Sequence, residues 1–296
     1  MATFKQYRER IQALKTAFDK GKKGKEALLR MIDEAEIPES VYNSNAIENS
    51  TLTLKETEKI LLDMEVSRDV SVREVYEARN LARVMEYIRN KGAAIRCDRE
   101  TILFLHKMLM HGIDDGIAGR FRDRGQYVRV GPHIAPAPEH VELMMAQLIQ
   151  DDESNLDAYV VDAIARFHLQ FETIHPFCDG NGRIGRVLIN MQLQLHDLPP
   201  VIIRDKEKQG YYGAFREFKD SHGRNARTME KILAIAILES LHKRVAYLGG
   251  GTLVPLKEYA KGKKRSLSSL INAAHRQTIP AFREKGVWKI DAKAVL

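Results

Sequence analysis

The apolar residues of the chain recur mostly at the spacing of an α-helix. Residues 160–174 follow this spacing at Val160, Ile164, Phe167, Phe171 and Ile174. Pro176 disfavours helical backbone at the residue before it, so this helix should end at His175. The same spacing returns from Ile184 to Leu198, which predicts a second apolar helix. Residues 179–182 should then be a loop that leads into a helix N-terminus.

One segment departs from the helical pattern before the C-terminal tail. Residues 125–138 alternate and then break on prolines, with Tyr127 and Arg129 on one side and Val128 and Val130 on the other. This pattern predicts a short β-hairpin that ends in a rigid loop. The fold class we expect is therefore mainly α, with a helical core and a hairpin.

The glycines at 249–251 mark a flexible joint before a small separate domain at 252–296. We expect residues 254–261 to form one helix and Ser266 to cap a second. Residues 279–290 should follow as strand, turn and strand. The other expected regions are an N-terminal helical region at 1–95 and a core at 96–248.

Composition narrows the class of protein. The 296 residues are 44% hydrophobic, which supports a real core. No apolar targeting region begins the chain, and the longest aliphatic run, residues 232–238, is too short to span a bilayer, so we expect a cytoplasmic protein. Cys97 and Cys178 are the two cysteines, which excludes a disulfide framework.

The net charge of +7 is unevenly distributed. Residues 252–296 hold ten Lys and Arg against three Asp and Glu, whereas the preceding residues hold 37 of each. An interaction with nucleic acid is therefore expected, if anywhere, in the tail.

The stretch at residues 175–186 carries the chemistry. It combines an imidazole, a carboxylate, three glycines and two arginines in twelve residues. Glycines at a helix N-terminus allow close approach to free backbone N–H groups, which bind anions. Arg183 and Arg186, three residues apart, can both hold phosphate oxygens.

Two side chains in this stretch suggest a reaction. Asp179 offers a hard oxygen that, with nucleotide phosphates, can hold Mg²⁺. His175 can take a proton near neutral pH and would be the general base for a hydroxyl. Together these groups indicate phosphoryl or nucleotidyl transfer.

Taken separately, a His-Pro pair is usually a helix cap and Asp-Gly-Asn-Gly is usually a turn. The complete string His175-Pro-Phe-Cys-Asp-Gly-Asn-Gly-Arg-Ile-Gly-Arg186, however, resembles the signature of Fic-domain protein adenylyltransferases, which move AMP from ATP to a protein hydroxyl. The resemblance implies that His175 is the base, that Asp179 binds Mg²⁺, and that the phosphates are held by Gly180, Asn181, Gly182, Arg183 and Arg186. The intact Gly185-Arg186 pair favours AMP transfer over the kinase-like relatives.

A second string, Ser44-Asn-Ala-Ile-Glu48-Asn49, places Ser44 and Glu48 on one helical face. By itself it would be a surface helix end with a cap at Ser50 or Thr51. It resembles the inhibitory motif of Fic proteins that carry their own brake, in which Glu48 would pair with Arg186. A charge-assisted bond of about 1.5–3 kcal/mol corresponds to about ten- to a hundredfold in nucleotide occupancy.

The resemblance also implies roles for two other segments. The hairpin would be a flap that pairs with the target, and its residues Val130, Gly131, Pro132 and His133 would line the nucleotide. Tyr211 and Tyr212 would lie near the adenine, although paired tyrosines are most often packing residues. For His168 a buried core position is expected.

The tail resembles a small winged helix. Arg276 and Lys264 would then meet DNA phosphates, and docking to a protein is a nearly equal alternative.

The resulting hypothesis is an ATP- and Mg²⁺-dependent protein adenylyltransferase, inhibited through Glu48 and able to form a homodimer. Alternatives are removal of AMP or transfer of another nucleotide by the same site, and a nucleotide-sensing regulator that binds DNA. The target protein, the nucleotide preference and the signal that relieves inhibition are not readable from the sequence.

Overall fold

The computed structural model describes residues 4–66, 70–131, 133–154, 158–261, 263 and 265–296. Within them the chain forms two compact units. Unit 1 comprises residues 1–36, 198–201 and 231–296, and unit 2 comprises residues 37–197 and 202–230. Lys264, for which a DNA contact was predicted, lies outside the described residues.

Unit 2 is mainly helical, as the apolar spacing predicted. Its elements are the last part of α2 (Glu26–Ile47), α3 (Leu54–Glu58), the π-helical turn η1 (Lys59–Asp63), α4 (Val72–Lys91), η2 (Gly92–Ala94), α5 (Arg99–Met110), β1 (Arg129–Val130), β2 (His133–Ile134), η3 (Pro138–His140), α6 (Val141–Ser154), α7 (Val160–Ile174), α8 (Asn181–Leu195), η4 (Asp205–Glu207), α9 (Lys208–Asp220) and the start of α10 (Arg227–Leu248).

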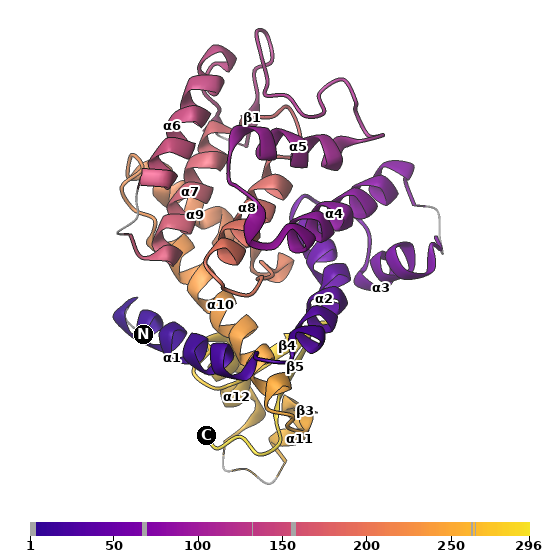
Figure 1. The fold of residues 1–296 in the computed structure, drawn as a ribbon, viewed down its shortest axis with the longest axis vertical. Helices are drawn as coiled ribbons and strands as arrows, with labels where there is room; N and C mark the ends of the chain where they lie inside the picture. Colours follow the sequence, from indigo (N-terminus) through magenta and orange to yellow (C-terminus); the bar gives the residue numbers. More distant parts are fainter. Residues whose placement is uncertain (1–3, 67–69, 132, 155–157, 262, 264) are drawn as a thin grey trace. The chain divides into compact units, whose positions relative to one another are not determined.

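The helices α7 and α8 form the centre of this unit (Figure 1). They pack against each other, and α4 and α5 cover α8 while α6 and α9 contact α7. The core contains Phe167, Phe171 and Phe177 together with Ile184 and Leu188, all nearly inaccessible to solvent. The two apolar patterns that flank residues 175–186 therefore fix the position of that stretch, because both adjoining helices are buried.

Short polar signals start several of these helices. Ser71 and Asp98 cap α4 and α5 by accepting a hydrogen bond from the backbone N–H three residues on. Thr53 caps α3, and Glu56 returns a bond to the backbone N–H of Thr53, so the pair forms a capping box. The prediction of a cap at Ser50 or Thr51 was therefore wrong by two to three residues, and the hydroxyls of these residues serve another contact.

The end of α2 has a distinct geometry. The N–H of Asn49 donates to the carbonyl of Ala46, and the N–H of Ser50 donates to that of Asn45. Asn49 is left-handed, with φ of 66°. This is the Schellman arrangement that ends a helix, and Asn tolerates the left-handed region better than most residues. Glu48 is thereby fixed as the last residue before the chain turns.

The hairpin predicted at residues 125–138 is present but short. Arg129 pairs with Ile134 and Val130 with His133 in antiparallel register. Gly131 has φ of 54°, in the left-handed region that a tight turn requires. Val130 and Ile134 are exposed, so this pair of strands presents apolar side chains to solvent.

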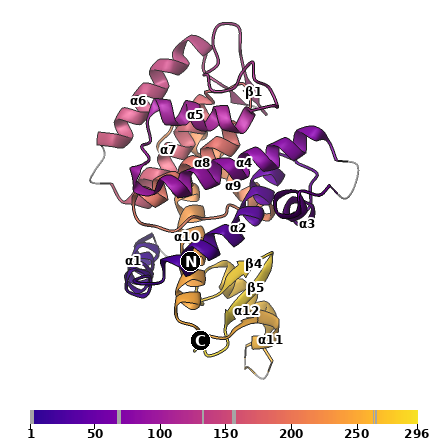
Figure 2. The same ribbon diagram turned by 45° about the vertical axis from the view of Figure 1, so that its right-hand side comes forward.

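Unit 1 contains the C-terminal tail. Its elements are α1 (Phe4–Gly21), the first turns of α2, most of α10, β3 (Leu253–Pro255), α11 (Leu256–Tyr259), α12 (Leu267–His275), β4 (Phe282–Glu284) and β5 (Val287–Asp291). The three strands form one antiparallel sheet in the order β3, β5, β4. Figure 2 labels two of them, β4 and β5.

The tail differs from the prediction at its start. Ser266 does cap α12, and the strand, turn and strand are present as β4 and β5. The expected helix at 254–261 is only α11, because Leu253–Pro255 pairs with β5 and forms a third strand. Leu256, Leu270, Ala273 and Ile290 form the core of this small sheet and its two helices. Three residues were too few for an alternating pattern to be recognised.

Two negative findings concern the described residues. None of their helices combines the length and the apolar character needed to cross a membrane. Cys97 and Cys178 are both free thiols. The absence of a disulfide between them agrees with the expectation from the cysteine count.

Asn49→Ala should lower the free energy of unfolding by about 1 kcal/mol, because a Cβ without a compensating side chain is disfavoured at positive φ. Asn49→Gly should leave it nearly unchanged, since glycine adopts this region freely. Guanidinium titrations followed by circular dichroism would measure both. Asn90→Ala, at an exposed position of α4, is the control and should not destabilise; equal losses for both Asn49 variants would contradict the assignment.

Candidate functional site

The first component of the site is the end of α7. His175 follows the last helical residue and has φ of 52°, so the chain turns sharply before Pro176. The guanidinium of buried Arg122 donates to the carbonyls of Ile174, His175 and Pro136, at 3.1, 2.8 and 2.6 Å. An arginine at a helix C-terminus satisfies carbonyls that have no helical partner. Arg122 therefore holds the histidine and the base of the hairpin loop together.

The His175 ring is mostly buried, and its Nδ1 lies 3.4 Å from the carbonyl of Glu172 and 3.6 Å from the Glu172 carboxylate. A carbonyl can only accept, so this contact favours the proton on Nδ1 and leaves the lone pair on Nε2. Burial lowers the pKa of His175 to about 4. The imidazole is therefore neutral at physiological pH and can accept a proton.

The second component is the start of α8. Gly180 is its N-cap with φ of 81°, a conformation suited to glycine. The helix begins at Asn181, so Gly182 lies in its first turn and not in the loop as predicted. The backbone N–H groups of residues 181–183 have no partner within a helix that starts here. These groups and the guanidinium of Arg186 are called the anion site below.

Asn181 has a structural use. Its side chain is 2% exposed, and it accepts a hydrogen bond from the N–H of Phe177 and donates one to the carbonyl of the same residue, both at 2.8 Å. This pair of bonds closes the loop between α7 and α8. The predicted contact of Asn181 with phosphate could therefore be made only by its backbone N–H.

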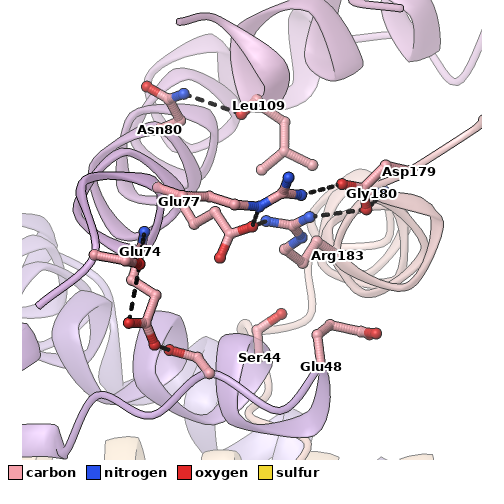
Figure 3. A network of polar contacts seen from close by, with 12 residues as sticks. Ser44, Glu48, Glu74, Glu77, Asn80, Leu109, Asp179, Gly180 and Arg183 are labelled. Atoms are coloured by element: carbon pink, nitrogen blue, oxygen red, sulfur yellow. Dashed lines mark hydrogen bonds and ion pairs between the residues drawn. The ribbon is translucent and has the colours of Figure 1, made fainter. Parts of the chain in front are cut away.

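Glu48 occupies the anion site. A Cβ placed on Gly182 would lie 2.1 Å from Oε1 of Glu48, so the carboxylate rests directly against this glycine. The same oxygen accepts a hydrogen bond from Arg186 at 2.7 Å. The Glu48 side chain is 40% exposed, and Figure 3 shows it beside Ser44, on the side of the network opposite α4. The predicted Glu48–Arg186 contact is thus present.

Each of the three guanidinium nitrogens of Arg186 has a polar partner. Its Nε donates to the Ser44 hydroxyl at 2.9 Å, and Nη2 donates to the Ser44 carbonyl at 2.8 Å. Nη1 lies 3.5 Å from the hydroxyl of Tyr211. Burial disfavours the charged form, but the adjacent carboxylate of Glu48 outweighs it and raises the pKa of Arg186. The guanidinium is therefore a fixed positive charge.

Arg183 and Asp179 form a second ionic cluster with α4. Arg183 lies 3.1 Å from Glu77 and 3.2 Å from Asp179, with only 4% of its side chain exposed. The other oxygen of Asp179 pairs with Arg73, which also donates to Glu77 at 3.0 Å. Burial opposes ionisation of Asp179, but the charges of Arg183 and Arg73 prevail and lower its pKa. Its carboxylate is ionised and faces cations.

The Asp179 carboxylate fits a hard cation such as Mg²⁺, since it is an ionised oxygen donor with 37% of the side chain exposed. Among the described residues, no group of three or more His, Cys, Asp and Glu could hold a metal. A cation at Asp179 would therefore draw its other ligands from water and from phosphates. It would also displace Arg73, whose side chain is 55% exposed and free to move into solvent.

His106 was not predicted from the sequence. Its Nδ1 accepts a hydrogen bond from the N–H of Gly119, so Nε2 carries the proton and donates to the carbonyl of Asp179 at 3.0 Å. The ring also stacks on Phe177 at 3.7 Å. Burial lowers the pKa of His106 to about 4, which keeps it neutral. It orients the loop that carries Asp179.

Gly185 lies under buried polar groups and away from the anion site. A Cβ there would meet Glu172 at 2.5 Å and His168 at 2.9 Å, so this glycine is required by packing. Burial and the nearby charge of Glu48 raise the pKa of Glu172 to about 8. His168, with 1% exposure and a 2.7 Å contact to the Tyr211 hydroxyl, is the core histidine that the sequence predicted.

The two tyrosines and the hairpin residues predicted to line the nucleotide differ in burial and in their contacts. Tyr211 is 2% exposed and packs among His168, Phe215 and Arg186. Tyr212 is 40% exposed, and its hydroxyl donates to the carbonyl of Ile47 at 2.7 Å, which anchors the end of α2. His133 reaches the carbonyl of Thr173 at 3.0 Å. The side chain of Val130 is exposed and Gly131 forms the hairpin turn, while Pro132 lies outside the described residues.

Fold and site together define a helical protein in which a neutral histidine, an anion-binding helix N-terminus and two buried arginines lie within one loop and helix. Residues 96–193 match the model of the Fic/DOC family. These residues of the chain therefore form a Fic/DOC domain.

Relatives in sequence and structure agree with this assignment. The protein adenylyltransferase Fic of Nematostella vectensis is 32% identical over 235 residues, which cover 77% of this chain and 52% of the relative. Protein adenylyltransferase fic-1 of Caenorhabditis elegans is 27% identical over 82% of this chain and 45% of its own length. This chain therefore spans about half the length of these curated relatives.

Solved structures share the fold. A Fic domain-containing signaling protein from Bacteroides thetaiotaomicron superposes with a TM-score of 0.72 at 22% identity, covering 82% of this chain and 98% of that one. A Fic family protein from Desulfovibrio desulfuricans gives 0.64 at 23% identity, covering 96% and 86%.

Gly182→Ala should have opposite effects with and without Glu48. In the Glu48→Gly background the helix gains an alanine, which should stabilise by about 0.5–1 kcal/mol. With Glu48 present, the new methyl group would displace the carboxylate from Arg186, and the lost charge-assisted hydrogen bond should cost about 1.5–3 kcal/mol, which exceeds that gain. Denaturant titrations of the four proteins measure this, and a change of the same sign in both backgrounds would show that Glu48 does not lie against Gly182.

The His175 ring should titrate near pH 4 in the folded protein, well below its ordinary value of 6.5. The unfolded chain binds more protons between these two values, so the contribution of His175 to stability falls as the pH drops through this window. Following the ring Cε1–H by NMR, with His175→Ala for assignment, measures the midpoint. A midpoint close to 6.5 would show that the ring is solvated.

Proposed function

We propose that this protein is an adenylyltransferase that moves AMP from ATP to a hydroxyl group of a target protein and that Glu48 inhibits it. The observation that carries the proposal is the anion site at the start of α8, where a carboxylate lies against Gly182 and binds Arg186. A site in which one carboxylate binds a guanidinium beside the free backbone N–H groups of a helix N-terminus also suits phosphate oxygens. The relatives in sequence are protein adenylyltransferases, which supports adenylyl transfer.

His175 supplies the acid–base chemistry. Its ring is neutral and the proton on Nδ1 faces Glu172, so Nε2 is available to take the proton of an incoming hydroxyl. The oxygen would then attack the α-phosphorus, and pyrophosphate would leave with the bonding electrons. Arg183 and Arg186 hold the departing phosphates by charge and position.

Asp179 would hold Mg²⁺, which when bound neutralises phosphate charge. The support is the ionised, partly exposed carboxylate beside the anion site. The side chain of Arg73, the present partner of Asp179, is exposed, so replacing its guanidinium by Mg²⁺ needs only a local movement. His106 fixes the backbone of Asp179 in either state.

The inhibition follows from competition for Arg186. While Glu48 accepts its hydrogen bond, a γ-phosphate lacks that donor and an oxygen atom already occupies the space above Gly182. ATP then binds weakly or with its α-phosphate displaced from His175. Because Glu48 is 40% exposed, solvent screening puts the effect near the lower end of the range expected from the sequence, about tenfold.

The target would bind beside the hairpin. Its exposed strands β1 and β2 offer backbone groups for pairing with an extended segment. The tail, with its sheet β3–β5–β4 and the helices α11 and α12, would dock either to DNA or to a protein.

Glu48→Gly should increase AMP transfer from α-labelled ATP by about tenfold, since it frees Arg186 for the nucleotide. Adding His175→Ala should reduce labelling by about 10²–10⁴-fold, which is the usual loss when a general base is removed. Incubation with Mg²⁺ and a lysate, followed by mass measurement of the added group, identifies AMP or another nucleotide.

The control for these measurements is Glu86→Gly, at an exposed glutamate of α4, which should not activate. Unchanged labelling by Glu48→Gly would refute the inhibition, and labelling that survives His175→Ala would refute the role of the histidine. Loss of AMP from pre-labelled protein, when Glu48 is present, would indicate hydrolytic removal of AMP by the same site instead.

A further inference from the structure

The N-terminal half of α4 presents polar side chains to the site, although none of them belongs to the two strings singled out in the sequence. Figure 3 shows Glu74, Glu77 and Asn80 along one side of this helix, with Glu77 directed at Arg183 and Glu74 directed towards the segment after Glu48. The two glutamates are three residues apart, and so are neighbours on one helical face. Their partners, however, belong to different parts of the site.

Glu74 holds the segment that follows α2. Its Oε1 accepts hydrogen bonds from the N–H of Thr51 at 2.6 Å, from the Thr51 hydroxyl at 2.9 Å and from the Ser50 hydroxyl at 3.1 Å. The other oxygen accepts from Ser71 at 3.1 Å, within the cap of α4. Burial opposes ionisation, but these donors prevail and lower the pKa of Glu74, so it is a carboxylate and each bond is charge-assisted.

These bonds restrain Glu48 through the backbone. Ser50 is two residues beyond Glu48, and the N–H of Ser50 also closes the end of α2. On the other side, Tyr212 donates to the carbonyl of Ile47 and Arg186 donates to that of Ser44. The turn that carries Glu48 is therefore fixed on both flanks, and Glu74 provides the side-chain contacts on its C-terminal flank.

Glu77 holds Arg183. Its Oε1 lies 3.1 Å from Nη1 of Arg183, and only 14% of the Glu77 side chain is exposed. Arg183 is almost completely buried, so its charge requires a fixed partner. Asp179 is the other carboxylate nearby, but a cation would compete for it. Glu77 is the partner that would remain when Asp179 binds a metal ion.

We propose that Glu74 and Glu77 are positioning residues of the nucleotide site that act in opposite directions. Glu77 keeps the guanidinium of Arg183 in place to bind phosphate, and Glu74 keeps the turn after Glu48 in place, so that Glu48 remains on Arg186. This assignment rests on the proposed function, because it takes ATP as the ligand of the site. Neither residue touches the reacting atoms.

The test is ATP binding at fixed Mg²⁺ in the His175→Ala background, where no AMP is transferred during the titration. Glu74→Gln and Glu77→Gln are each compared with Glu48 present and with Glu48→Gly. Glu86→Gln, an exposed glutamate on the same helix, is the matched control. Thermal unfolding of each variant is recorded alongside.

With Glu48 present, Glu74→Gln should tighten ATP binding by about two- to tenfold, the equivalent of about one hydrogen bond. In the Glu48→Gly background it should have no effect, because the residue it holds in place is gone. Glu77→Gln should weaken ATP binding by about two- to tenfold in both backgrounds. Glu86→Gln should change neither.

Since Glu74 also accepts a hydrogen bond from Ser71, the N-cap of α4, a second variant changes the partner side. Ser50→Ala combined with Thr51→Val removes the two hydroxyl donors to Glu74, keeps the backbone donor of Thr51, and should reproduce part of the tighter binding. An effect of Glu74→Gln that is equal in both backgrounds, or unchanged ATP affinity in Glu77→Gln, overturns the inference. If Glu48→Gly itself binds no ATP, the proposed function fails instead.

Discussion

The charge of Arg186 is the constraint on which the rest of the site depends. A guanidinium does not lose its proton in a protein, so an arginine that is 6% exposed needs an anion beside it. The hydroxyl and carbonyl of Ser44 satisfy donors but carry no charge. Glu48 supplies the charge, and the bare face of Gly182 gives its carboxylate room. Removing the anion without replacement would leave a buried charge uncompensated, so the site favours some anion at all times.

That requirement explains how one location would serve both the proposed inhibition and the binding of phosphate. The start of α8 offers backbone N–H groups, the positive end of a helix dipole and a guanidinium. The side chain of Asn181 forms the two hydrogen bonds to Phe177 that close the loop, so the anion site keeps its shape whichever anion is present. Arg122 and His106 do the same for the backbones of His175 and Asp179. His175 and Asp179 lie on short segments, and the backbone of each is held by a buried polar side chain from elsewhere in the unit.

The sequence predicted those parts of the site whose signals are local. Apolar spacing and Pro176 located the end of α7, and the string to Arg186 located the start of α8 to within two residues. Arg73, Glu77 and Arg122 were missed because each acts on a residue more than fifty positions away, and nothing in the neighbouring sequence marks an inward-facing charge. For Glu74 a signal existed, since Ser71 and Glu74 have the spacing of a capping box. Its bonds to Thr51 could not be read from that spacing.

The strength of the proposed inhibition would depend on where Glu48 is held more than on how well a carboxylate binds arginine. A tethered group competes with a free ligand at an effective concentration of about millimolar for a flexible link, and higher when the tether is fixed in the bound geometry. The Schellman turn at Asn49 and the anchor at Ile47 give Glu48 such a tether. ATP must therefore gain its advantage from phosphates that Glu48 cannot imitate, above all at Arg183. If the proposed function holds, regulation should act on the tether, because loosening the backbone around Glu48 changes the competition without altering any group that would contact the nucleotide.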